Sequence, residues 1–173
     1  MEKFNVLSLD ISAASTGWSF SQSNGKFKYG LIKTDPKQSR SKRLVQFRVE
    51  LSKLLTILGP THVVIEDIFL GLNPKTLVIL SKFAGVAEEL CLSVIGVEPY
   101  IIHTNTVKAF FKATNKEDIF NIIVCLLELE EEFKFSKHND LTDSIAQLLC
   151  YCDSVLECKK FKFEKEYGYL YEV

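Results

Sequence analysis

Four acidic side chains stand where a charge is not expected from packing alone. Asp10 ends an apolar run, Glu66 lies inside the most apolar run of the chain, and Asp140 and Asp143 are three residues apart in a helical pattern. If they converge in one crevice, their repulsion favours divalent cations, and oxygen ligands select Mg²⁺ or Mn²⁺. Two such ions can activate water and stabilise the leaving oxygen of a phosphodiester. The set therefore predicts metal-dependent hydrolysis of a nucleic-acid backbone.

Each acid also has a purely structural interpretation. Asp10 could cap a loop, and Glu66 could pair with a buried lysine or arginine. Asp140 and Asp143 could be first-turn acids that complement a helix dipole. Each signal is weak alone, and the occurrence of all four in this order of elements favours a shared site over these alternatives.

The elements that must position the acids follow from hydrophobic periodicity. The predicted strands cover residues 4–10, 17–20, 27–32, 62–69 and 100–103. The predicted helices cover residues 39–58, 75–95, 106–112, 117–132 and 139–158. This order predicts an α/β fold with a mixed five-stranded sheet and helices on both faces. Because functional groups gather at the carboxyl ends of strands, Asp10 and Glu66 are expected to border one crevice.

Composition limits the classes of protein that fit. The 173 residues are 47% apolar, enough for one well-buried domain, and the net charge of -1 excludes a globally basic nucleic-acid coat. No secretory segment and no apolar run of about 18 residues is found, so we expect a cytosolic protein without membrane association. The cysteines are odd in number, lack C-x-x-C pairing and are expected to be reduced packing residues: Cys91, Cys125, Cys150, Cys152 and Cys158.

The acids and their flanking motifs resemble the RuvC family of Holliday junction resolvases, in the ribonuclease H-like superfamily. The likeness extends to about residue 158 and rests on LSLDISAASTGW around Asp10, VVIEDIF around Glu66 with NPKT following, VK at Lys108 and DLTD at 140–143. It implies a ribonuclease H-like fold, with a nuclease domain at 1–158 and a C-terminal extension at 159–173. Compact size and a divergent, Lys- and Phe-rich sequence are typical of a phage or viral member, acting in the cytoplasm of a bacterial or infected host cell.

The resemblance implies an activity and a set of partners. It implies a homodimeric, Mg²⁺-dependent endonuclease, with Mn²⁺ as a substitute and two ions per site, that resolves Holliday junctions and other branched DNA. The four acids match the family's catalytic metal ligands position by position. For the dimer contact we expect an apolar stripe on the helix after Pro74, formed by Leu77, Leu80, Phe83, Ala84, Ala87 and Leu90.

Further residues are expected to contact DNA. Phe69 matches a family aromatic that stacks on an unpaired base. Lys108 and Lys116 match basic residues close to the scissile phosphate, and Lys112 could share that surface. The alternatives are a core phenylalanine and solvated lysines.

Another basic group could contact a junction arm or form an ordinary solvated face; it consists of Lys33, Lys37, Arg40, Lys42 and Arg43. His138 could assist the metal site or donate to phosphate, or be a plain surface histidine. The family commonly has glycine two residues after the first aspartate, where this chain has Ser12. At Ser12 the approach of the backbone to a phosphate is therefore expected to differ from the family. Gly17, at the start of the second predicted strand, is retained.

Three rival functions fit parts of the pattern. Another ribonuclease H-like nuclease could act on RNA-DNA hybrids or flaps, or as an exonuclease. A nucleotide-binding protein of the actin and sugar-kinase type would also begin with an aspartate and a turn, but it needs a longer chain and a second glycine-rich motif. A non-catalytic junction-binding protein would gain nothing from four acids that repel phosphate.

Overall fold

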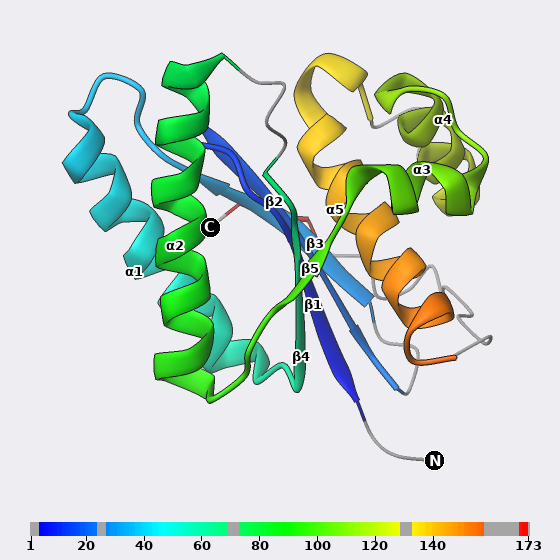
Figure 1. The fold of residues 1–173 in the computed structure, drawn as a ribbon, viewed down its shortest axis with the longest axis horizontal. Helices are drawn as coiled ribbons and strands as arrows, with labels where there is room; N and C mark the ends of the chain where they lie inside the picture. The colour runs from blue at the N-terminus through cyan, green and yellow to red at the C-terminus, as the bar shows by residue number, and fades with distance from the viewer. Residues whose placement is uncertain (1–3, 24–26, 69–72, 129–132, 158–169, 173) are drawn as a thin grey trace.

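The computed structural model describes residues 4–23, 27–68, 73–128, 133–157 and 170–172. Its strands are β1 (Asn5–Asp10), β2 (Ser15–Gln22), β3 (Phe27–Lys33), β4 (His62–Glu66), β5 (Tyr100–Ile102) and β6 (Leu170–Glu172). They form one sheet in the order β5-β4-β1-β2-β3-β6 (Figure 1). β1, β2 and β3 are antiparallel neighbours, whereas β4, β5 and β6 join by parallel pairing. The predicted α/β class with a mixed sheet is confirmed, and β6 adds a sixth strand to the five predicted.

Helices cover both faces of this sheet, as predicted (Figure 1). One face carries α1 (Arg40–Leu58) and α2 (Pro74–Ile95); the other carries α3 (Thr104–Phe111), α4 (Lys116–Leu127) and α5 (Phe135–Ser154). Ser39 caps the start of α1 by accepting a hydrogen bond from the Lys42 amide. Gly59 and Gly96 end α1 and α2 in the left-handed conformation that favours glycine. These local signals explain why both helix boundaries could be predicted.

Four other boundaries, in three elements, were predicted wrongly. β4 ends at Glu66 rather than residue 69, and α4 ends at Leu127 rather than residue 132. α5 runs from Phe135 to Ser154, whereas the prediction was 139–158. The earlier start of α5 has a local cause, because the His138 ring accepts a hydrogen bond from the Lys134 amide at the helix N-terminus.

This earlier start changes the environment of the acid pair. Asp140 and Asp143 lie more than one turn inside α5, and the first turn contains no acid. The interpretation of these residues as first-turn acids that complement the helix dipole is therefore wrong. Their charges must be explained by what the middle of α5 faces.

Side-chain alternation along β1 decides which face of the sheet carries Asp10. Leu9 packs in the core beneath α1 and α2, whereas Val6 packs in the core beneath α5. Ser8 lies on the α5 side as well, where its hydroxyl donates a hydrogen bond to Gln147 of that helix. Successive side chains point to opposite faces of a strand, so Asp10 shares the α5 side with Val6 and Ser8.

The same alternation holds along β4. Ile65 packs beneath α1 and α2, and Val64 packs on the α5 side, so Glu66 also lies on the α5 side. β1 and β4 are parallel, with Leu9 opposite Ile65. Asp10 and Glu66, one residue further along their strands, are therefore neighbours at the same edge and on the same face.

The apolar stripe predicted for a dimer contact on α2 is largely internal. Phe83, Ala84, Ala87 and Leu90 are buried within the chain's own core, and the ring of Phe83 lies 5.2 Å from that of Phe47 in α1. The prediction that the stripe exceeds what the sheet buries is wrong for these four residues. The reason is that α1 packs beside α2 and covers part of it.

The prediction that the cysteines are packing residues is confirmed for Cys91, Cys150 and Cys152 and is wrong for Cys125. Cys91, Cys150 and Cys152 are buried free thiols, and Cys125 is an exposed one; Cys158 lies outside the described residues. Burial and the nearby Glu88 charge raise the pKa of Cys91 to about 12, which keeps it protonated and unreactive. In the described part of the chain, no helix has both the length and the apolar character needed to cross a membrane.

Candidate active site

Asp10 and Glu66 form the centre of the site at the carboxyl ends of β1 and β4. The side chain of Asp10 is buried, with only 6% of the residue exposed. Burial raises the pKa of Asp10 well above its ordinary value, and the negative charge of Glu66 raises it further. This pair of acids costs folding free energy unless a proton or a cation neutralises it.

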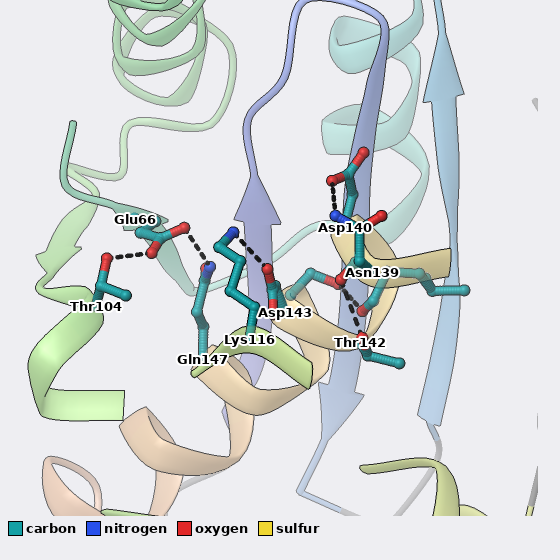
Figure 2. Close-up of polar contacts among 10 residues, drawn as sticks. Glu66, Thr104, Lys116, Asn139, Asp140, Thr142, Asp143 and Gln147 are labelled. Atoms are coloured by element: carbon teal, nitrogen blue, oxygen red, sulfur yellow. Dashed lines mark hydrogen bonds and ion pairs between the residues drawn. The ribbon is translucent and has the colours of Figure 1, made fainter. Parts of the chain in front are cut away.

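Glu66 is held by two side chains from the helices on its face (Figure 2). The Thr104 hydroxyl, from the first turn of α3, donates to Oε1. The Gln147 amide, from α5, donates to Oε2 at 3.4 Å and accepts from the Ser8 hydroxyl at 3.2 Å. Glu66 therefore points toward the crevice in a fixed orientation.

α5 contributes Asp140 and Asp143 (Figure 2). Asp140 lines the same cavity as Asp10 and Glu66, and Asp143 lines a small adjoining pocket with Glu66 and Lys116. Burial, together with the neighbouring carboxylates, raises the pKa of both residues above the ordinary value. Asn139 donates a hydrogen bond to Asp140 at 2.9 Å. The pKa of Asp143 is also raised by the charge of Glu66, so the four acids interact as one cluster.

Lys116, at the start of α4, is the cation bonded to this cluster. Its ammonium lies 2.7 Å from Asp143 Oδ2 (Figure 2). Burial opposes its charge, but Asp10 and Asp143 outweigh burial and raise the pKa of Lys116 above its ordinary value. The direct ion pair between Lys116 and Asp143 was not predicted from the sequence. Lys116 had been assigned only to phosphate contact.

A cavity of about 680 Å³ opens in front of the cluster. Asp10, Glu66 and Asp140 line one part of its wall, and Lys108 and Lys116 bring positive charge to the same wall. Lys108 also lowers the pKa of Asp143 by its charge. Lys108 and Lys116 therefore lie beside the acids, and their predicted contact with DNA stays a prediction.

The loop after Asp10 is held by side chains in place of the family's glycine. The Ser12 hydroxyl accepts hydrogen bonds from the amides of Ala14 and Ser15. Arg43 donates to the Ala13 carbonyl, as does the Thr34 hydroxyl. Predicted as a DNA contact, Arg43 lines the cavity but also connects α1 to this loop.

The remaining predicted DNA contacts do not share one location. Arg40 and Lys42 are exposed at the start of α1, and Lys112 is exposed at the end of α3 in the left-handed conformation. Among the described residues, none of the three lines the cavity. Phe69 lies outside the described residues.

His138 is placed by the structure at the N-terminus of α5. Its ring stacks on Phe133 with centroids 4.7 Å apart, and Nδ1 accepts from the Lys134 amide. Burial, with the charges of Lys137 and Lys33, lowers the pKa of His138. Within the described residues the cavity lining does not include it.

Sequence reasoning missed Thr104, Gln147, Asp67 and His103. Gln147 follows Asp143 by one helical turn, so a polar side chain continuing the acid face of α5 was a usable signal. Thr104 carried no such signal, because only the packing of α3 brings it to Glu66. Asp67 Oδ2 and His103 Nδ1 lie 2.9 Å apart on the cavity wall.

The donor chemistry of the cluster fits a hard divalent cation. Within the part of the chain that the structure describes, no three His, Cys, Asp or Glu side chains lie close enough to hold one ion together. However, three of the four acids have raised pKa values, because burial and mutual repulsion exceed the charge that Lys116 supplies. Carboxylate oxygens with excess negative charge are ligands that Mg²⁺ and Mn²⁺ accept.

The strand order and the acids at one edge of the sheet define a ribonuclease H-like domain. The fold matches Thermus thermophilus RuvC in complex with a Holliday junction substrate, with a TM-score of 0.72 and 18% identity over 90% of this chain and 97% of that one. It also matches the yeast mitochondrial Holliday junction resolvase Ydc2, with a TM-score of 0.58 and 10% identity over 91% of this chain and 84% of that one.

The sequence comparisons identify the family. The family model for crossover junction endodeoxyribonuclease RuvC matches residues 6–151, and the chain belongs to the RuvC family. The RuvC protein of Alkaliphilus metalliredigens is 30% identical over 156 residues, which cover 86% of this chain and 93% of the relative. That of Caldicellulosiruptor saccharolyticus is 28% identical over 155 residues, which cover 84% and 90%.

Proposed function

We propose that this chain is a structure-selective endonuclease that resolves Holliday junctions and other branched DNA by metal-dependent phosphodiester hydrolysis. Membership of the RuvC family supports the substrate class. The observation that carries the chemistry is the convergence of Asp10, Glu66, Asp140 and Asp143 in one partly buried, mutually repelling cluster. A pure DNA-binding surface would be weakened by such charges, because they repel phosphate.

The four acids are proposed as the catalytic metal ligands. Two Mg²⁺ ions, or Mn²⁺ in their place, would supply Lewis-acid activation of water and stabilisation of the leaving oxygen. Thr104 and Gln147 hold the Glu66 carboxylate in one orientation, which reduces the reorganisation needed when a ligand binds. Lys108 and Lys116 place positive charge on the wall that a phosphate would face.

A homodimer is part of the proposal, since a four-way junction offers two equivalent strands to cut. The buried stripe of α2 cannot make the contact. Val78 and Leu92 of the same helix are 52% and 62% exposed and offer an alternative apolar surface. Light scattering at micromolar concentration tests this, and a monomeric mass would contradict it.

Cleavage of a synthetic immobile four-way junction tests the activity, with cut positions mapped on each strand. We expect metal-dependent nicking by the wild type, and loss of nicking with retained folding and junction binding in Asp10→Asn and Asp143→Asn. Asp153→Asn is the matched control, because Asp153 is an exposed acid of the same helix as Asp143. Full cutting by both active-site variants would remove these residues from the mechanism.

The same assay includes flap, RNA-DNA hybrid and duplex substrates. Selective nicking of the junction supports the proposal. Faster hydrolysis of the hybrid or the flap than of the junction would assign the chain to another ribonuclease H-like activity. Metal-independent binding without cutting of any substrate would favour a non-catalytic junction-binding protein.

A further inference from the structure

His103 and Asp67 lie close together beside the acid cluster, at the carboxyl ends of β5 and β4. His103 Nδ1 lies 2.9 Å from Asp67 Oδ2, and the two side chains are 72% and 44% exposed. Both residues line the same cavity as Asp10 and Glu66. Among the described residues, no side-chain hydrogen bond joins His103 or Asp67 to the four acids, Lys108 or Lys116.

Local structure does not account for the pair. His103 occupies the N-cap position of α3, but its side chain makes no capping hydrogen bond. Exposed ion pairs contribute little to folding stability, because water and salt screen the two charges. The backbone already ties the two strand ends together, since the Asp67 amide donates to the Ile102 carbonyl at 2.9 Å.

The pair leaves one ring nitrogen available to a ligand. Asp67 lies beside Nδ1, so Nε2 is the nitrogen that this largely exposed ring presents to a ligand on the cavity wall. The charged groups that share this wall are Asp10, Glu66, Asp140, Lys108, Lys116 and Arg43. A DNA backbone that enters the cavity would place anionic oxygens against them.

We propose that His103 is a substrate-positioning residue whose Nε2–H donates a hydrogen bond to a DNA backbone phosphate in the cavity, with Asp67 fixing the ring. This inference rests on the proposed nuclease function. In the proposed complex each ring nitrogen faces an anionic oxygen, Nδ1 that of Asp67 and Nε2 that of the phosphate, so the ring carries a proton on both nitrogens. The resulting positive charge replaces a counterion on the DNA.

Counterion release gives a specific test. Junction binding is measured at several salt concentrations in metal-free buffer, where cleavage is not expected, for the wild type, His103→Gln and Asp67→Asn. Loss of one phosphate contact lowers the magnitude of the slope of log K against log salt by about 1. We expect this reduction in His103→Gln, and a smaller reduction in Asp67→Asn, because an amide still accepts from Nδ1 but no longer favours the charged ring.

Controls separate this inference from folding and from the proposed function. Lys53→Gln, which alters an exposed ion pair of α1 outside the cavity lining, is expected to keep the wild-type slope. Unchanged unfolding midpoints show that the variants fold. If His103→Gln keeps the wild-type slope and affinity while the wild type still cleaves the junction, the inference is wrong. A slower cleavage rate of His103→Gln with unchanged binding would also overturn it. Failure of the wild type to bind or cut any junction would instead overturn the proposed function.

Discussion

Gly17 of β2 packs directly against the main chain of Asp140 in α5. A Cβ at position 17 would overlap the Asp140 carbonyl group and lie 2.8 Å from the Leu141 amide nitrogen. In the sheet, Gly17 is also the antiparallel partner of Asp10. Because Gly17 has no side chain, α5 can approach β2, the strand that pairs with β1 at Asp10. This approach brings Asp140 and Asp143 close to Asp10 and Glu66.

Gly17→Ala is expected to destabilise the protein and to reduce cleavage strongly. The added methyl group must push α5 away from β2, and overpacking of this kind costs about 1–3 kcal/mol. Chemical denaturation measures the stability, and junction nicking measures the activity.

Gly85→Ala serves as the matched control for this substitution. A Cβ at Gly85, inside α2, would meet no atom within 4 Å. Alanine in a helix interior is favoured over glycine by about 0.5–1 kcal/mol, so this variant is expected to be slightly stabilised and fully active. Equal effects of the two substitutions would contradict the close approach as the cause.

The metal-free protein is expected to lose stability as pH rises from the acidic range toward neutrality. The pKa values of Asp10, Asp140 and Asp143 are raised in the folded state, first of all by burial. Between the ordinary aspartate pKa and these raised values, the folded state binds more protons than the unfolded chain, so the free energy of unfolding falls with increasing pH.

Thermal melts of metal-free protein between about pH 4.5 and 7.5 measure this effect. Asp10→Asn removes one of the titrating groups, so its melting temperature is expected to fall less steeply than that of the wild type over this range. Addition of Mg²⁺ at neutral pH is expected to raise the wild-type melting temperature more than that of the variant. Parallel curves for the two proteins would argue against burial of Asp10 in a charged cluster.

Thr104→Val is expected to weaken metal binding without unfolding the protein. Valine keeps the shape of threonine but cannot donate to Glu66, which loses one of its two orienting partners. Loss of such a partner typically lowers metal affinity by about 10–100-fold. The concentration of Mg²⁺ that gives half-maximal nicking, together with calorimetric binding of Mn²⁺, reports the change.

Thr56→Val is the control for this substitution. The Thr56 hydroxyl donates only to the Ser52 carbonyl within α1, outside the cavity lining. The variant is expected to need no more metal than the wild type. An unchanged metal requirement in Thr104→Val would show that Glu66 does not depend on the hydroxyl.

Lys116→Gln is expected to destabilise the metal-free protein by about 1–2 kcal/mol, because Asp143 is buried and loses its cationic partner. Half of the lysine side chain is exposed, which keeps the expected cost moderate. A divalent cation is expected to restore much of the lost stability.

Lys53→Gln, in an exposed pair with Glu50, is expected to change stability by less than about 1 kcal/mol. Equal melting temperatures for both variants without metal would contradict a neutralising role for Lys116.

The four acids could be predicted from the sequence because their signals are local. Asp10 ends an apolar run and Glu66 interrupts another, so each carboxyl group stands out from the apolar residues next to it in the sequence. Alternation along each strand shows which neighbours share a face with each acid, whereas the pairing of Leu9 with Ile65 in the sheet places both acids on the same face. The class of fold followed from the same local periodicities.

The partners of the acids could not be predicted in the same way. Lys116 was assigned to phosphate, yet it bonds to Asp143, and Arg43 was assigned to DNA, yet it supports the loop after Asp10. Thr104, which donates a hydrogen bond to Glu66, lies 38 positions from it in the sequence. Long charged side chains can extend in several directions, and only the packing of helices on the sheet selects among them.

The sequence by itself therefore determined the kinds of groups present and the elements that carry them, because residue type and hydrophobic period are properties of short segments. The tertiary structure alone decided how α5 approaches β2 at Gly17, which cation neutralises Asp143 and which side chains orient Glu66. These relationships depend on distances between residues far apart in the chain, and electrostatic and hydrogen-bond energies fall steeply with distance.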